Sequence, residues 1–226
     1  MSVELTIDTA SDVASVALSQ EGALVAELTW RCPRNHSAQL LPTLQYLMQR
    51  AGVDKSDLTA IFVCVGPGSY TGLRVGMSTA KGLAFALSLP IVGVGRLEAD
   101  AYQHSDYRGP ICAIHRAGRG ESAWAVYQGG ASAWREVIPP RLTLPQDLLT
   151  EKRLKNALFC GEVSDDLAES LREALGPKTL VVGPAASVRR AATVAELAWR
   201  RLASGDTDDA ASLKPIYLRE AVVAPP

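Results

Sequence analysis

The stretch VGPGSYTGLRVG, residues 65–76, leads from a glycine-rich turn directly into a helical pattern, and its glycines raise the question of a phosphate-binding loop. A phosphate-binding P-loop needs a glycine, four residues and then Gly-Lys-Ser or Gly-Lys-Thr, and neither Gly66 nor Gly68 begins such a run. The dinucleotide fingerprint G-x-G-x-x-G would need a glycine at position 71, where this chain has Thr71. The segment therefore matches neither familiar nucleotide motif.

Two interpretations of this turn remain open. In the first, the Gly-Pro-Gly triplet reverses the chain and a following hydroxyl caps the helix. In the second, free backbone N–H groups at the helix start, with Arg74 nearby, bind an anion. Asp8 and Thr9 follow the first strand and suit a capped turn at least as well as a contact to a cation or to a phosphate-bound water. The candidate phosphate or nucleotide contacts are Asp8, Thr9, Ser69, Thr71 and Arg74.

The helix that follows carries a stripe of small residues. Gly72, Gly76, Ala80 and Ala84 recur every four residues, so they share one face and let another backbone approach closely. Glycine inside a helix costs about 0.5–1 kcal/mol relative to alanine, which indicates that close packing offsets a penalty. The packing partner is either the sheet of the same domain or a helix of another subunit, and the sequence leaves both open.

Hydrophobic periodicity predicts an α/β protein with one repeated order of elements. The first half has strands at 3–7, 14–18 and 23–30, a helix at 37–51, a strand at 60–65, a helix at 71–88 and a strand at 91–94. The second half has strands at 110–114, 123–127 and 134–138, a helix at 145–150, a strand at 157–160, a helix at 165–175, a strand at 180–182 and a helix at 193–204. Both halves read β-β-β-α-β-α, with a boundary near 97–109.

Composition excludes several classes of protein. The 226 residues are 47% hydrophobic and 21% charged, with a net charge of -1, which favours a globular domain without a basic field for nucleic acid. The four cysteines show no metal spacing and are expected to be reduced. Neither a signal-peptide pattern nor a long apolar run is present, so we expect a cytoplasmic protein that does not enter the membrane.

Catalytic patterns are sparse. The histidines at 36, 104 and 115 form no HExxH or other two-histidine helix pair, and no G-x-S-x-G is present. His115, Arg116, Arg119 and Glu121 lie on a loop between two strands, where charged side chains are usually solvated. The residues by themselves therefore predict no catalytic centre and no metal site.

Five segments together resemble the TsaB family: IDTASDVASVAL (7–18), RNHSAQLLPTLQYLM (34–48), GPGSYTGLRVGMSTAKGLA (66–84), IVGVGRLEA (91–99) and PIYLRE (215–220). TsaB, formerly YeaZ and often labelled a glycoprotease or M22 peptidase homologue, is the non-catalytic subunit of the bacterial machinery that makes threonylcarbamoyladenosine in tRNA. The resemblance is dense over the first hundred residues and loose beyond them. The long glycine segment is its most specific part.

The resemblance implies an actin/Hsp70-like (ASKHA) fold of two ribonuclease-H-like lobes. The first lobe would span residues 1–100 and the second 101–220, with the terminal helix free to pack back on the first lobe and 221–226 as a flexible tail. The two helices of the first lobe would pack against their counterparts in TsaD, the catalytic paralogue, or in a second copy. The residues in or near that surface would be Leu44, Met48, Gly72, Gly76, Ala80 and Ala84.

Two features of the sequence qualify what the resemblance implies, one by contrast with TsaD and one as a departure from the family pattern. TsaD carries an HxxxH metal pair on its first helix, whereas here His36 is followed four residues later by Leu40, which argues against metal catalysis and peptidase activity. The family usually has Asp-Ala-Arg at the end of a second-lobe strand, but this chain has His115-Arg116-Ala117. This difference leaves the contacts of the second lobe, and nucleotide binding with them, open.

The resemblance implies an accessory subunit that activates TsaD, with TsaE as an ATPase partner, tRNA reached through the complex and a homodimer when alone. The resemblance implies that this subunit has no cofactor of its own, although ATP or ADP with magnesium could bind at the interface of the complex. An alternative of a different class is an ASKHA-type ATPase or small-molecule kinase that uses Asp8, Thr9 and the second-lobe loop. A metallopeptidase is a third possibility.

Overall fold

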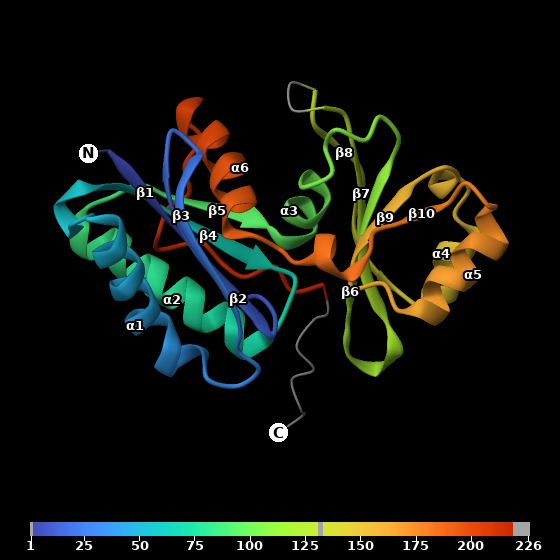
Figure 1. The fold of residues 1–226 in the computed structure, drawn as a ribbon, viewed down its shortest axis with the longest axis horizontal. Coiled ribbons are helices and arrows are strands. Elements are labelled where there is room, and N and C mark those ends of the chain that lie inside the picture. The colour runs from blue at the N-terminus through green and yellow to red at the C-terminus, as the bar shows by residue number, and fades with distance from the viewer. Residues whose placement is uncertain (1, 131–132, 219–226) are drawn as a thin grey trace. The chain divides into compact units, whose positions relative to one another are not determined.

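The computed structural model describes residues 2–130 and 133–218, which form two compact units (Figure 1). The first unit contains the chain up to Ala99 together with Val188–Pro215, and the second contains Asp100–Ser187 and the described residues from Ile216 onward. Each unit holds one five-stranded mixed sheet. The expected tail at 221–226, and the last two residues of the PIYLRE segment, lie outside the described residues.

The first sheet has the order β3-β2-β1-β4-β5. Its strands are β1 (Val3–Asp8), β2 (Val13–Gln20), β3 (Ala23–Arg31), β4 (Leu58–Gly66) and β5 (Ile91–Gly95). β1, β2 and β3 pair antiparallel, whereas β4 and β5 extend the sheet in parallel. All six residues of β1 are buried, although successive side chains point to opposite faces, so both faces of the sheet are covered.

Three long helices cover this sheet. They are α1 (His36–Ala51), α2 (Tyr70–Leu87) and α6 (Ala191–Ala203). α1 and α2 lie side by side on one face, and α6 lies on the other (Figure 1). α1 ends as predicted at Gly52, which adopts the left-handed conformation that favours glycine. The apolar side chains of α1 and α2 join those of β1, β2 and β4 in one core.

The second sheet repeats this order as β10-β9-β6-β7-β8. Its strands are β6 (Ile111–Arg116), β7 (Ser122–Gln128), β8 (Arg135–Thr143), β9 (Leu158–Gly161) and β10 (Leu180–Val181). α4 (Pro145–Thr150) and α5 (Asp165–Leu175) complete the unit. Short 3-10 turns lie at Lys55–Asp57, Gly118–Gly120, Lys152–Leu154 and Pro184–Ser187. The β-β-β-α-β-α order predicted for both halves is confirmed.

The structure differs from the sequence-based boundaries at three places. A helix that was not predicted, α3 (Arg96–Tyr102), spans the division between the units. β8 continues through Pro139 and Pro140 to Thr143, which is possible because β8 is the outer strand of its sheet. Residues 188–215 belong with the first unit. The predicted boundaries placed them in the second lobe, with the terminal helix free to pack back on the first.

Candidate functional site

The glycine-rich turn joins β4 to α2 and packs on the turn that follows β1. The backbone N–H of Ser69 donates to the carbonyl oxygen of Ala10 at 2.8 Å. A Cβ atom on Gly68 would collide with the same carbonyl group, so the close approach of the two turns requires glycine there. Ser69 is the N-cap of α2, and its Oγ accepts from the N–H of Gly72 at 3.3 Å. The capped-turn interpretation is thus confirmed for Ser69.

The small-residue stripe of α2 faces inward. Gly72, Gly76, Ala80 and Ala84 are all buried, and a Cβ on Gly76 would collide with Oγ1 of Thr9 at the end of β1. Of the two packing partners that the sequence left open, the sheet of the same unit is the one observed. All four are covered within the unit and do not form an exposed surface, and their place in or near a partner surface stays a prediction.

The two predicted surface residues of α1 also contribute to the core. Leu44 is buried and belongs to the first hydrophobic core, and Met48 is half-buried and packs against it. Their burial has the same cause as that of the stripe, because the faces of α1 and α2 that the sheet covers are the ones rich in leucine, methionine and small residues. Leu44 is therefore not exposed, whereas Met48 is partly exposed, and the place of both residues near a partner surface stays a prediction.

A different face of α2 points to solvent. It carries Thr71, Arg74, Ser78, Gly82 and Phe85, whose spacing of three or four residues places them along one side of the helix. The Phe85 side chain is 86% exposed. Apart from the glycine, its two chain neighbours and the nearby backbone of α2, no described atom lies within 4 Å of the position that a Cβ on Gly82 would take. This face therefore presents a large aromatic ring and a helical glycine whose cost no packing within the described chain offsets.

The first helix adds further exposed apolar groups to the unit. Leu41 and Tyr46 of α1 are 56% and 54% exposed, and Tyr70 at the start of α2 is 55% exposed. The guanidinium of Arg74 lies 3.9 Å from the centroid of the Tyr70 ring in a cation–π contact. α1 and α2 thus bury one face in their own unit and leave aromatic and aliphatic side chains on the other.

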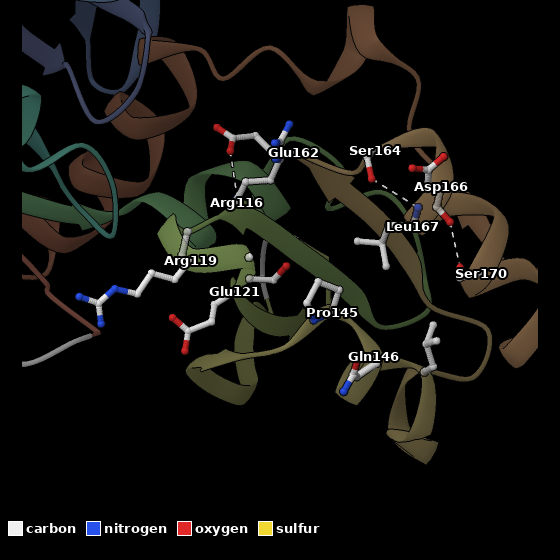
Figure 2. Close-up of a pocket in the computed structure, with 14 residues that line it drawn as sticks. Arg116, Arg119, Glu121, Pro145, Gln146, Glu162, Ser164, Asp166, Leu167 and Ser170 are labelled. Carbon is white, nitrogen blue, oxygen red and sulfur yellow. Dashed lines mark hydrogen bonds between the residues drawn. The ribbon is translucent and has the colours of Figure 1, made fainter.

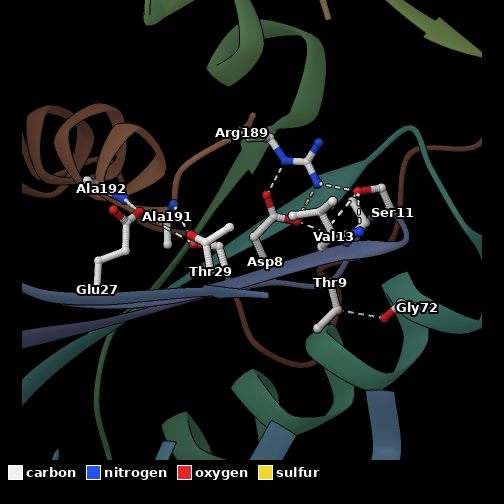
Figure 3. Close-up of polar contacts among 12 residues, drawn as sticks. Asp8, Thr9, Ser11, Val13, Glu27, Thr29, Gly72, Arg189, Ala191 and Ala192 are labelled. Atoms are coloured by element: carbon white, nitrogen blue, oxygen red, sulfur yellow. Dashed lines mark hydrogen bonds and ion pairs between the residues drawn. The ribbon is translucent and has the colours of Figure 1, made fainter. Parts of the chain in front are cut away.

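Asp8 lies at the end of β1 and is buried in a polar cluster (Figure 3). Its carboxylate accepts from Nε and Nη2 of Arg189, which is itself buried, and from the N–H of Ala10. Burial alone would raise the pKa of the Asp8 carboxyl, but the charge and hydrogen bonds of Arg189, with the Ala10 N–H, hold that pKa below its ordinary value. Asp8 is therefore an ionised carboxylate that forms a buried ion pair with Arg189.

Thr9 turns to the other side of the chain and meets α2. Its Oγ1 donates to the carbonyl oxygen of Gly72 at 2.7 Å (Figure 3). The structure thus brings together Asp8, Thr9 and the capped start of α2 at Ser69, whereas their role as phosphate or nucleotide contacts stays a prediction. Thr71 and Arg74 are not part of this cluster, since both side chains point to solvent from the exposed face of α2.

The same polar cluster anchors the start of α6. The side chain of Arg190, the N-cap residue, makes no capping hydrogen bond to this helix. Instead, the N–H of Ala191 donates to Oγ of Ser15 and the N–H of Ala192 donates to Oε1 of Glu27, both at 3.0 Å. Arg190 pairs with Glu27 at the edge of the cluster. The first turn of α6 is therefore held by side chains from β2 and β3. Sequence reasoning did not identify Arg189 or Arg190 as part of this cluster, because two adjacent arginines before a helix match no functional motif and are usually surface residues.

The second unit contains a separate pocket of about 640 Å³ (Figure 2). The loop after β6, the start of α4 and the start of α5 line it, with Arg116, Arg119 and Glu162 among the charged residues. Oε2 of Glu162 lies 3.0 Å from Nδ1 of His115 and accepts from the N–H of Arg116 at 3.0 Å. One carboxylate, that of Glu162 directly after β9, thus holds His115 and the backbone of Arg116 in the atypical His115-Arg116-Ala117 sequence.

The histidines and cysteines do not gather into a metal centre. His36 is buried, and its Nε2 lies 3.0 Å from the carbonyl oxygen of Ser11, to which it must donate. Within the described residues no group of three or more histidine, cysteine or acidic side chains is placed to hold a metal ion. All four cysteines are buried and unbridged, and burial raises the pKa of three of their thiols, Cys64, Cys112 and Cys160. Among the helices described, none is both long and apolar enough to cross a bilayer.

Comparison with known proteins places this architecture among its relatives. A family model described as TsaD, tRNA N6-adenosine threonylcarbamoyltransferase, matches residues 30–224. The tRNA threonylcarbamoyladenosine biosynthesis protein TsaB of Bacillus subtilis is 32% identical over 219 residues, covering 96% of this chain and 94% of the relative.

Solved structures agree with this match. YeaZ from Pseudomonas aeruginosa has a TM-score of 0.80 and 27% identity, covering 96% of this chain and 100% of its own. The ROK hexokinase of Thermus thermophilus, at 12% identity and a TM-score of 0.52, covers 89% of this chain and 99% of its own, and shares the fold alone. The expected actin/Hsp70-like fold of two related lobes is confirmed.

Proposed function

The chain belongs to the TsaB (YeaZ) family of tRNA threonylcarbamoyladenosine biosynthesis proteins, and on this premise we propose that it is a non-catalytic subunit that binds and activates a TsaD transferase. The transferase would move a threonylcarbamoyl group from its adenylate to the adenosine beside the anticodon of ANN-decoding tRNAs. In this proposal the chain contributes a binding surface and no reacting group.

The observation that carries the proposal is the exposed face of α2. An 86% exposed phenylalanine stands one turn from a helical glycine with open space above it. Burying such a ring against a partner is worth about 1.5–3 kcal/mol, and a glycine lets the backbone of a second helix come close. A partner helix laid along Thr71, Arg74, Ser78, Gly82 and Phe85 would use both features.

The proposal includes the partners that go with this role. TsaD binds as a heterodimer, TsaE joins as the ATPase partner, and the chain forms a homodimer when TsaD is absent. tRNA is reached through the complex, because the net charge of -1 offers this chain little attraction to a phosphate backbone. ATP or ADP with magnesium binds at the interface of the complex, and the assembly works in the cytoplasm, where tRNA is modified.

The experiment replaces exposed residues on the proposed surface and on another face. Phe85→Glu places a charge on the surface, and Gly82→Arg fills the open space above the glycine. Leu180→Glu is the matched control, because Leu180 is an exposed apolar residue, 49% accessible, on β10 of the second unit. Complex formation with TsaD is followed by size exclusion and calorimetry, and threonylcarbamoyladenosine formation by a reconstituted assay.

We expect Phe85→Glu and Gly82→Arg to weaken TsaD binding at least tenfold and to lower the modification rate in parallel. Leu180→Glu should bind TsaD as the wild type does. Circular dichroism should stay unchanged in all three variants, because none of the replaced side chains is buried. If both α2 variants bind and activate TsaD normally, the exposed face of α2 is not the partner surface.

The alternative function is an ASKHA-type ATPase or small-molecule kinase. Isothermal titration of ATP with Mg²⁺ into the isolated protein distinguishes the two, because tight binding with hydrolysis would contradict a subunit that only provides a surface. The polar cluster around Asp8 bears directly on this alternative, since it is where such an enzyme would hold its metal and phosphates.

A further inference from the structure

The actin/Hsp70-like fold implies a magnesium–nucleotide site at the turn after the first strand, and the side chains of this chain do not fit one. A magnesium ion needs free oxygen ligands, usually from one or two carboxylates, and a phosphate needs free N–H or hydroxyl donors. Among the candidate phosphate and metal contacts at this place, Asp8, Thr9 and Ser69 carry such groups, and each is already engaged within the first unit.

Both oxygens of the Asp8 carboxylate already accept hydrogen bonds from groups of the first unit. One oxygen, Oδ2, accepts from Nε of Arg189. The other, Oδ1, accepts from Nη2 of Arg189 at 3.1 Å and from the N–H of Ala10 at 2.9 Å. The two parallel bonds from one guanidinium form the bidentate geometry in which arginine holds a carboxylate most strongly.

The guanidinium itself is also fixed in place. Nη2 of Arg189 donates to Oγ of Ser11, at 3.2 Å, as well as to Asp8 (Figure 3). The Arg189 side chain is 4% exposed and that of Asp8 is 1% exposed, so water does not screen the pair. Arginine stays protonated throughout the accessible pH range, so the positive charge cannot be removed by deprotonation.

We propose that Arg189 is a built-in cation that occupies the place of a metal ion at Asp8 and closes the first-lobe turn to magnesium and phosphate. A divalent ion could bind Asp8 only by expelling a buried guanidinium of the same sign. Arg189 is the second residue after the chain returns to the first unit, and the N–H groups of α6 that follow it are held by Ser15 and Glu27. The metal site has thus become an attachment point for the C-terminal helix.

This inference is independent of the partner surface on α2. It implies that any nucleotide in the complex is held by groups other than Asp8 and Thr9 of this chain. A chain that failed to bind TsaD could still have a closed turn, and one that bound TsaD could still have an open turn.

The test uses Mn²⁺ as a probe, measured by water proton relaxation, on the wild type, Asp8→Asn, Arg189→Ala and the double variant. Arg190→Ala is the matched control, because Arg190 is the adjacent arginine and pairs instead with Glu27. Wild type, Asp8→Asn and Arg190→Ala should give the same titration. Arg189→Ala should bind Mn²⁺ at least tenfold more tightly, and the double variant should lose that gain.

A second measurement tests the guanidinium directly. Millimolar methylguanidinium should raise the Tm of Arg189→Ala and leave that of the double variant unchanged, because only the single variant keeps the buried Asp8 carboxylate without its guanidinium partner. Asp8-dependent Mn²⁺ binding in the wild type would overturn the proposal. So would a folded Arg189→Ala protein that gains no Mn²⁺ site. If Arg189→Ala does not fold, the comparison of wild type with Asp8→Asn still decides.

Discussion

At the scale of single residues, Asp8 determines how the first unit responds to acid. Its pKa lies below the ordinary value of 3.8, so the carboxylate stabilises the fold above that pH, and the contribution disappears as the pH falls towards the folded-state pKa. Asp8→Asn should destabilise the protein by about 3–5 kcal/mol at pH 7, because it leaves the buried Arg189 charge uncompensated. Below about pH 4 the difference from the wild type should shrink, as urea unfolding between pH 3 and 7 will measure.

Asp206→Asn is the control for this pH dependence. Hydrogen bonds from Arg201 also lower the pKa of Asp206, but that carboxylate is 56% exposed and screened by water. Its replacement should change the unfolding free energy far less than Asp8→Asn at every pH. Equal effects of the two substitutions, or a gap between Asp8→Asn and wild type that widens in acid, would contradict the role assigned to the buried pair.

At the scale of elements, two of the three glycines of α2, Gly76 and Gly82, should respond to alanine in opposite ways. Gly82→Ala should stabilise the protein by about 0.5–1 kcal/mol, because the added Cβ meets open space and alanine is the better helix former. Gly76→Ala should destabilise it by about 1–3 kcal/mol, because the same atom would collide with Thr9 at the end of β1. Thermal or urea unfolding of the two variants measures both values.

Each glycine variant serves as the control for the other, since both make the same chemical change in one helix. A stabilising Gly76→Ala would mean that the contact between α2 and β1 is looser than described. A destabilising Gly82→Ala would mean that this position needs glycine for a reason within the isolated chain. If TsaD binding falls while stability rises in Gly82→Ala, the glycine serves the partner.

The same helix shows what periodicity predicts and what it leaves undetermined. The four-residue recurrence correctly predicts that Gly72, Gly76, Ala80 and Ala84 share a face, because the helical repeat fixes that geometry. It does not say what covers the face, since a sheet and a partner helix both favour small residues. α3 was missed because its seven residues are too few for a periodic pattern, and β8 was cut short because two prolines usually end a strand.

At the scale of the whole molecule, the candidate site depends on contacts that the sequence does not reveal. The order of elements in both lobes was predictable from the local patterning of apolar residues. The pairing of Asp8 with Arg189 joins residues 181 positions apart, and neither carries a motif that identifies its partner. Ser69 was predictable as a cap because that contact spans only three residues. Local contacts were therefore predictable from the sequence, whereas the contact that closes the turn at Asp8 could be identified only from the folded structure.

Because the first unit is built from two separate stretches of the chain, a substitution in the second stretch should loosen strands of the first. Leu213, near the end of the described chain, packs against the core formed by β1, β4 and α2, and Lys81 of α2 donates to its carbonyl oxygen. Leu213→Ala should cost about 1–2 kcal/mol for this half-buried side chain and speed amide exchange in β5, more than a hundred residues earlier. Leu171→Ala, in the buried core of the second unit, should cost about 2–5 kcal/mol and speed exchange in β6 and β9 instead. Hydrogen exchange followed by mass spectrometry separates the two patterns, and loosening of β6 and β9 by Leu213→Ala with β5 unchanged would contradict the division of the chain into these units.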